Sequence, residues 1–273
     1  MWLGKNLKLN CLRGQTKRAS VVLSLLCLPA LFWGDFIAIA QQKTSYGLGI
    51  KLPQQTGGLH VAPNYCITAI APKDGGRTLS QHPTLYFYLI KRKNEQDIFM
   101  SELRITLKQD EGESTRNLYV FRVKVNNLDE GLYKIDLPIG DFPDLNRKIQ
   151  HWTMDGIDTD LSRLQRTSLY VQQESNENAL KEIQSKGTLL DKARIYAKYY
   201  YWYDAFDAYS QWLEHHPKDV VARHEREDML QENFSSQCID FYSYIYLSFK
   251  ELLEAIDVKT AKEIAIDKIK NSP

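Results

Sequence analysis

The sequence has none of the short motifs that usually identify a catalytic, metal or nucleotide site. It contains no H-E-x-x-H, no C-x-x-C, no G-x-S-x-G, no G-x-G-x-x-G and no phosphate-loop pattern. Its glycine pairs, Gly57-Gly58 and Gly75-Gly76, precede no predicted helix and are typical of turns. We therefore expect no resident cofactor or metal, and no catalytic residue that a motif identifies.

The chain also lacks an excess of charge of one sign, with 35 basic and 34 acidic residues. Five of the basic residues lie within the first 18 positions, so the rest of the chain is mildly acidic. Binding to nucleic-acid phosphates is driven by clustered Lys and Arg. Nucleic acid is therefore not an expected partner.

No apolar run is long enough to span a bilayer, which takes roughly 18 apolar residues. The run at residues 19–33 is shorter, follows the basic segment and is itself followed by Asp35. Ala38 and Ala40 then supply the small residues of a leader-peptidase site. We predict a signal peptide over residues 1–40, export to the periplasm or the cell exterior, and no stable membrane span after processing.

Cysteine is scarce, at four residues. Two of them, Cys11 and Cys27, lie in the predicted signal peptide, and the bulky Leu26 argues against lipid attachment at Cys27. Cys66 and Cys238 remain in a compartment that permits a disulfide. The sequence leaves open whether they bond to each other or are two unpaired buried thiols.

Short β-strand patterns follow a polar, glycine-rich lead-in that is predicted to be flexible over residues 41–61. Residues 85–90 form a continuous apolar run, while residues 103–107 and 119–125 alternate between apolar and polar. Polar turns rather than helices separate these strands, which favours an antiparallel arrangement. We predict an immunoglobulin-like β-sandwich over residues 62–171, with Trp152 in its core.

The periodicity becomes helical at about residue 172, which predicts a helical region over 172–273 and a segregated α+β fold. Thr188 is the predicted N-cap of a helix. Residues 186–217 resemble one tetratricopeptide hairpin, through Leu189, Ala193, Tyr196, Ala205, Tyr209, Trp212 and Pro217. One such unit cannot bury its own apolar stripe, so we expect it to pack on the sandwich or on later helices. Those helices are predicted over residues 220–230, 239–256 and 260–270.

Aromatic side chains are concentrated between residues 196 and 212. They could form the core between the helices and the sandwich, or a surface that binds a protein or glycan partner. The candidate partner-binding residues are Tyr199, Tyr201, Trp202, Tyr203 and Phe206.

A short acidic segment invites comparison with a calcium-binding loop, through Asp155, Asp158, Asp160 and Ser162. Counted from Asp158, the sixth position is Arg163 where such a loop needs Gly, and the twelfth is Leu169 where it needs Glu. We interpret the segment as a solvated acidic loop. The adjacent His215 and His216 precede Pro217 and are expected to cap a helix C-terminus rather than bind metal.

Three stretches of the chain resemble a known family: CITAIAP at residues 66–72, QHPTLYFY at 81–88 and WYDA at 202–205. In this order they are similar to exported cyanobacterial proteins described as domain of unknown function nine-two-eight. The likeness covers most of residues 66–219 and implies export and origin, but no activity. Residues 151–158 hold no cysteine where the family usually has one, and residues 225–248 look inserted.

We expect a non-enzymatic interaction or structural module of the cell envelope, whose helical hairpin contacts a partner. Two alternatives remain open. One is a hydrolase or metal-dependent enzyme with a site assembled from distant groups, for instance His82, His151 and the carboxylates of residues 155–160. The other is an extracytoplasmic ligand-sensing module.

Overall fold

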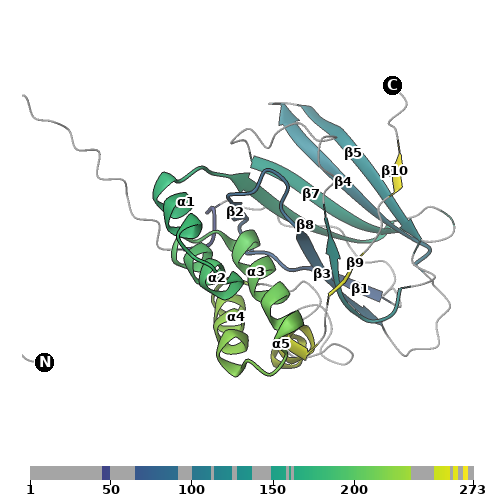
Figure 1. The fold of residues 1–273 in the computed structure, drawn as a ribbon. Coiled ribbons are helices and arrows are strands. Elements are labelled where there is room, and N and C mark those ends of the chain that lie inside the picture. The colour runs from purple at the N-terminus through teal and green to yellow at the C-terminus, as the bar shows by residue number, and fades with distance from the viewer. Residues whose placement is uncertain are drawn as a thin grey trace, which may run out of the picture. The chain divides into compact units, whose positions relative to one another are not determined.

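Strands come first along the chain and most of the helices follow, as Figure 1 shows for the computed structural model. The predicted α+β class, with strands before helices, is confirmed. The structure describes residues 45–49, 65–91, 100–111, 114–124, 128–136, 149–157, 160, 163–234, 249–258, 261–263 and 267–269. The predicted signal peptide, with Ala38 and Ala40, lies outside these residues.

The strands of the described residues form two sheets. In chain order they are β1 (Tyr65–Ala69), β2 (Gly76–Thr78), β3 (Leu85–Lys91), β4 (Glu102–Glu111), β5 (Ser114–Lys124), β6 (Gly131–Ile135), β7 (Ile149–Ile157), β8 (Arg163–Gln173), β9 (Lys262–Glu263) and β10 (Asp267–Ile269). Within the described residues, one sheet has the order β1-β3-β6-β9 and the other the order β10-β5-β4-β7-β8-β2.

Alternation of apolar and polar residues sets which face of each strand points into the core. In β4 the side chains of Leu103, Ile105 and Leu107 are buried, as their spacing predicted. Leu107 lies opposite Trp152 of β7, which is fully buried, so its predicted place in the core is confirmed. Residues 85–90 of β3 are likewise all buried. One hydrophobic cluster contains residues of both sheets.

Two edge strands depart from the antiparallel prediction. β2 pairs in parallel with β8, and β9 in parallel with β6. The prediction of a helix over residues 260–270 is wrong, because β9 and β10 lie there. These two short strands pair with the backbones of β6 and β5, and such pairing at a sheet edge outweighs a helical spacing of apolar residues.

The helices are α1 (Glu177–Gln184), α2 (Leu189–Lys198), α3 (Trp202–His215), α4 (Val220–Asn233) and α5 (Phe249–Val258). The predicted N-cap of α2 is confirmed, since Thr188 Oγ1 accepts a hydrogen bond from Asp191 N at 3.1 Å. The helix pair α2–α3 lies within the predicted hairpin. Part of the helix predicted over 239–256 is α5, while residues 239–248 lie outside the described residues.

The helices share a core with the sheets. Trp202, Tyr203 and Phe206 of α3 belong to the same buried cluster as the strands, and a second cluster joins α2, α3 and α4. Residues 42–273 form one compact unit. Part of the predicted lead-in also packs there, because Tyr46 is buried and makes edge-to-face contact with Trp202 at a centroid distance of 5.3 Å.

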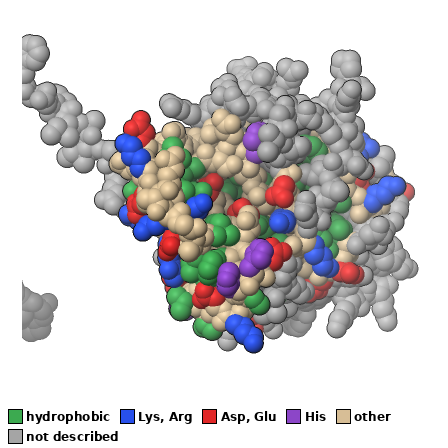
Figure 2. Space-filling model, viewed as in Figure 1, with side chains coloured by type: hydrophobic (Ala, Val, Ile, Leu, Met, Phe, Trp, Pro, Cys, Tyr) green, Lys and Arg blue, Asp and Glu red, His purple; other side chains and the backbone are tan. Residues whose placement is uncertain are grey.

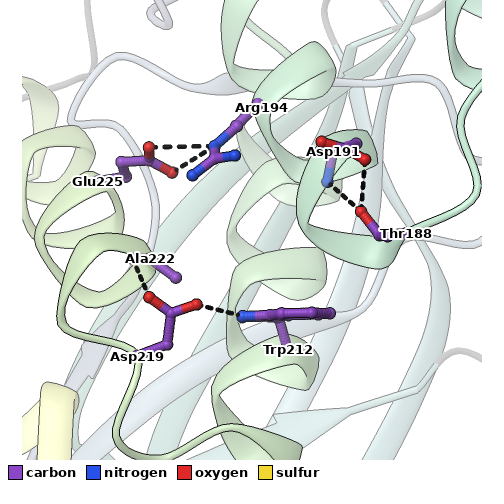
Figure 3. A network of polar contacts seen from close by, with 7 residues as sticks. All are labelled: Thr188, Asp191, Arg194, Trp212, Asp219, Ala222 and Glu225. Atoms are coloured by element: carbon purple, nitrogen blue, oxygen red, sulfur yellow. Dashed lines mark hydrogen bonds and ion pairs between the residues drawn. The ribbon is translucent and has the colours of Figure 1, made fainter.

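Polar contacts fix α4 beside the hairpin (Figure 3). Arg194 of α2 binds both carboxylate oxygens of Glu225 on α4, at 3.1 and 2.9 Å. The N-cap of α4, Asp219, accepts one hydrogen bond from Ala222 N at 3.0 Å and another from Trp212 Nε1 at 2.8 Å. The backbone donor lowers the pKa of Asp219 most, followed by the indole. These contacts hold α2, α3 and the start of α4 together.

One buried amide joins the two sheets. Gln165 of β8 accepts from Ile67 N of β1 at 2.9 Å, and its Nε2 donates to Ile67 O at 3.1 Å and to Cys66 Sγ at 3.2 Å. A side-chain amide thus pairs with the backbone of β1 as a neighbouring strand would. Because β1 ends its sheet within the described residues, this contact also closes a sheet edge.

Replacing Gln165 by Leu should destabilise the protein, because the N–H and C=O of Ile67 would stay buried without this partner. We expect the free energy of unfolding in urea to fall by about 2–4 kcal/mol. Gln172→Leu on the same strand removes a half-buried amide and should change it by less than about 0.5 kcal/mol. Equal effects of the two substitutions would contradict a bridging role for Gln165.

Candidate functional site

The first turn of α3 is attached to the strands by consecutive side chains. Trp202 Nε1 donates to the carbonyl of Ile70 at 3.3 Å, just after β1. Tyr203 OH donates to the carbonyl of Tyr170 in β8 at 2.8 Å. Both aromatic side chains are almost fully buried, so each needs such an acceptor for its polar atom.

The third side chain of this turn, Asp204, binds the segment that connects β2 to β3. Its carboxylate accepts hydrogen bonds from Leu79 N at 2.9 Å and from Ser80 N at 3.2 Å. A further hydrogen bond comes from the Thr78 side chain. The acid therefore holds residues 78–80 against α3.

A cavity of about 310 Å³ opens beside this contact. Its walls are one face of α2, one face of α3 and residues 80–84. Leu189, Lys192 and Tyr196 of α2 line it because their spacing places them on one side of the helix. On α3 the lining carboxylates are Asp204 and Asp207, which are three residues apart and so share a face.

The wall formed by residues 80–84 is ordered by its own hydrogen bonds. Ser80 Oγ accepts from His82 N at 3.0 Å, and Thr84 Oγ1 donates to Asp136 at 2.9 Å. The ring of His82 also lines the cavity, but its Nδ1 is buried without a hydrogen-bond partner. Pro83, which is buried, precedes β3 and limits the backbone freedom of this wall.

Burial dominates the electrostatics of the two carboxylates. It raises the pKa of Asp204 to about 6, against the lowering effect of the three hydrogen bonds from residues 78–80. It also raises the pKa of Asp207, although Tyr86 OH donates to that carboxylate at 2.7 Å and Gln211 Nε2 at 2.8 Å. The pKa of Tyr196 is raised first by burial and then by these two acids, whose charges therefore act on its phenol.

The predicted partner-binding aromatics do not form an exposed surface. Tyr201, Trp202, Tyr203 and Phe206 are at most 2% exposed. Tyr199 is half-buried, and its hydroxyl donates to Glu182 at 3.0 Å. The core interpretation fits this burial, because the wide apolar rings fill the space between α3 and the sheets. Partner binding through the four buried rings would require α3 to leave the sheets.

The groups of the assembled-site alternative are not brought together. His82 lines the cavity, whereas the ring of His151 on β7 stacks on Tyr170 at a centroid distance of 4.4 Å and does not line it. Asp155 is held by Arg166 through two contacts of 2.6 and 2.8 Å. Strand register places Asp155 opposite Arg166, which explains the pair.

The acidic segment offers no calcium site among the described residues. Asp155 is buried in its ion pair, Asp160 is exposed, and Asp158 and Ser162 lie outside the described residues. Across the described part of the chain, no group of three or more His, Cys, Asp or Glu side chains is placed to hold a metal ion.

The histidines at the end of α3 cap it, as predicted. The Nδ1 atoms of His215 and His216 lie 2.9 and 3.1 Å from the carbonyls of Gln211 and Trp212. His216 also stacks on the Trp212 indole at a centroid distance of 3.7 Å. Both rings therefore contact backbone carbonyls in the last turn of α3.

Cys66 is disulfide-bonded. The other cysteines, Cys11, Cys27 and Cys238, lie outside the described residues, and so therefore does the bonded partner. The alternative of an unpaired thiol at Cys66 is wrong. The bond exists although residues 151–158 contain no cysteine.

Charge is mixed on the face of the molecule that Figure 2 shows. Acidic and basic side chains are interspersed there, and the described residues of this face form no large patch of either sign. Among the helices that the structure describes, none combines the length and apolar character needed to cross a membrane.

The fold and the cavity define an α+β protein in which α2, α3 and the β2–β3 connection line a small, open polar pocket. A family model described as Domain of Unknown Function (DUF928) matches residues 50–238. The match covers more than half of the chain, which therefore belongs to this family, as the sequence resemblance predicted. Comparison with curated proteins finds no match.

Sequence reasoning missed most of the pocket. It singled out His82 only in a different grouping, and it treated Asp204 only as part of a family motif. Lys192, Tyr196 and Asp207 were not considered as site residues. A usable signal was present, since Asp204 and Asp207 are acids three residues apart inside an otherwise apolar, aromatic helix.

The raised pKa of Asp204 predicts how stability depends on pH. Its folded pKa of about 6 exceeds the unfolded value of about 3.9, so the folded state binds more protons between these values. The stabilisation is complete below about pH 4 and is lost as pH rises through 6. Relative to Asp204→Asn, the unfolding free energy of the wild type should fall by roughly 2–3 kcal/mol between pH 4 and pH 7.

Urea unfolding at several pH values measures this difference. The matched control is Asp160→Asn, which replaces an exposed acid outside the pocket. A difference between Asp204→Asn and the wild type that does not change with pH would show that the folded protein does not raise this pKa.

Proposed function

We propose that the chain is an exported, non-enzymatic binding module that holds a small ligand in the pocket between α2, α3 and residues 80–84. The observation that carries this proposal is the pocket itself, with its preorganised polar walls. Asp204 is fixed by three hydrogen bonds and Asp207 by two, so both acids are oriented before any ligand arrives. Preorganised groups reduce the entropy that binding must lose.

The two family-like motifs support placing the function here. His82, Pro83 and Thr84 come from the QHPT stretch, and Tyr203 and Asp204 from the WYDA stretch. They are more than a hundred residues apart in the chain and line the same cavity. The buried aromatics of α3, by contrast, offer little surface to a protein or glycan. The proposed binding site is therefore the pocket and not the surface of the hairpin.

Binding is favoured over catalysis by the hydrogen bonding inside the pocket. Within the described residues, Nδ1 of His82 makes no hydrogen bond, and Ser80 Oγ accepts from the backbone of His82 rather than from Nδ1. An activated nucleophile would need a base within hydrogen-bond reach. Asp204 has the raised pKa that is typical of catalytic acids, but its oxygens hold backbone N–H groups.

Export is supported by two independent features. The basic segment, the apolar run and the Ala38-x-Ala40 site occur in the order of a signal peptide. Cys66 is disulfide-bonded, which is typical of proteins in oxidising compartments. The protein would therefore bind its ligand in the periplasm or outside the cell. An extracytoplasmic sensing module would need the same pocket.

Export predicts a defined N-terminus. N-terminal sequencing of the secreted or periplasmic chain should begin at Gln41, because the peptidase pockets accept the small side chains of Ala38 and Ala40. The double substitution Ala38→Trp and Ala40→Trp should leave an unprocessed, cell-associated form. Recovery of the wild type only as an unprocessed chain would contradict cleavage after Ala40.

Ligand binding predicts selective thermal stabilisation. A library of small polar compounds should contain members that raise the Tm of the purified chain by roughly 5–10 °C at concentrations near a hundred times Kd. Lys192→Trp, which places an indole at the pocket wall, should abolish the shift. Lys181→Trp, an exposed helical position outside the pocket, should retain it. Shifts that survive Lys192→Trp would place binding elsewhere.

A further inference from the structure

The pocket carries more negative than positive charge. The carboxylates that line it are Asp204 and Asp207, and the lining cation is Lys192. None of the ion pairs formed by described residues involves either carboxylate or Lys192. Their charges are therefore free to act on whatever occupies the cavity.

The hydrogen bonds to the two acids bring no positive charge, although the charge of Lys134 acts weakly on Asp207. Leu79 N, Ser80 N and the Thr78 hydroxyl bind Asp204, and all of these donors are neutral. Asp207 receives only the neutral donors Tyr86 OH and Gln211 Nε2. Each ionised carboxylate can accept about four hydrogen bonds. Asp207, with two donors, retains acceptor capacity, whereas Asp204 already accepts four when its own backbone N–H is included. A cationic donor would supply hydrogen bonds and countercharge together.

The other lining groups suit an organic cation. Leu189, Pro83 and Ala208 provide apolar surface for methylene groups, and the ring of Tyr196 lies within the field of both acids. A cavity of about 310 Å³ is at the small end of ligand pockets. A metal ion is a poorer fit, because the described residues include no cluster of three metal-ligating side chains.

We propose that this pocket binds a small aliphatic molecule carrying a protonated amine, with Asp207 as the hydrogen-bond acceptor of the ammonium and Asp204 as a second negative charge beside it. This assignment rests on the proposed binding function and specifies its ligand class. A neutral polyol would bring no positive charge to the two carboxylates, and an anion would face them with Lys192 as the lining cation in its favour.

Isothermal titration calorimetry with three probes of equal chain length tests the charge requirement. Putrescine is the four-carbon diamine, and the matched controls are the corresponding butanediol and succinate. Near neutral pH, we expect putrescine to bind the purified chain saturably at millimolar concentrations or below, and the two controls not to bind. Equal binding of butanediol or succinate, or no binding of putrescine, would overturn the assignment.

Two substitutions should move the affinity in opposite directions. Asp207→Asn removes one carboxylate charge and should weaken putrescine binding by about tenfold or more. Lys192→Glu adds a carboxylate on the facing wall, at a half-buried position that tolerates a polar side chain, and should strengthen it by about tenfold. Urea unfolding checks that each variant folds. Unchanged affinity in a folded Lys192→Glu protein would overturn the assignment even if Asp207→Asn did not fold.

The same measurements separate this inference from the function on which it rests. Suppose that a neutral or anionic compound stabilises the chain and that this effect is lost in Lys192→Trp. The proposed binding function would then stand, and the assignment of an amine as the ligand would be wrong. If no compound in the library shifts the Tm and putrescine gives no heat of binding, both proposals fall.

Discussion

The attachment of the first turn of α3 to the strands is the contact on which the rest of this molecule depends. Trp202, Tyr203 and Asp204 are consecutive, yet they bind the end of β1, the carbonyl of Tyr170 in β8 and the β2–β3 connection. The helix geometry points consecutive side chains in different directions, which lets one turn reach three segments. Because Trp202 and Tyr203 are buried and Asp204 is half-buried, a missing bond would leave a poorly solvated polar group without its partner. The cost of such a group fixes the helix in one place.

The same attachment creates the pocket and its charge. Asp204 is removed from bulk water in order to bind residues 78–80, and the raised pKa is the consequence of that desolvation. Asp207, one turn further on, is similarly buried and bound by neutral donors. A buried anion whose hydrogen-bond donors are all neutral costs free energy. A bound cation would recover part of this cost, which links the stability of the fold to ligand binding.

Local sequence patterns predicted the elements that depend on local physics. Alternation in β4, the continuous apolar run of β3 and the Thr188 cap of α2 all match the structure. The helix predicted over residues 260–270 is wrong because pairing with the edges of β5 and β6 outweighs a helical spacing of apolar residues. The pocket was not predicted, because its walls come from residues 80–84 and from the two helices more than a hundred positions later.

The sequence by itself determined the class of this protein, its membership of the DUF928 family and the burial of Trp152. These follow from periodicity, motif order and hydrophobicity, which are readable one segment at a time. Tertiary structure decided that the α3 aromatics are core and that the QHPT and WYDA stretches meet. It also decided that Asp204 and Asp207 are desolvated together. Desolvation and countercharge depend on which distant segments pack against a residue, and that information is absent from the residue's own neighbourhood in the chain.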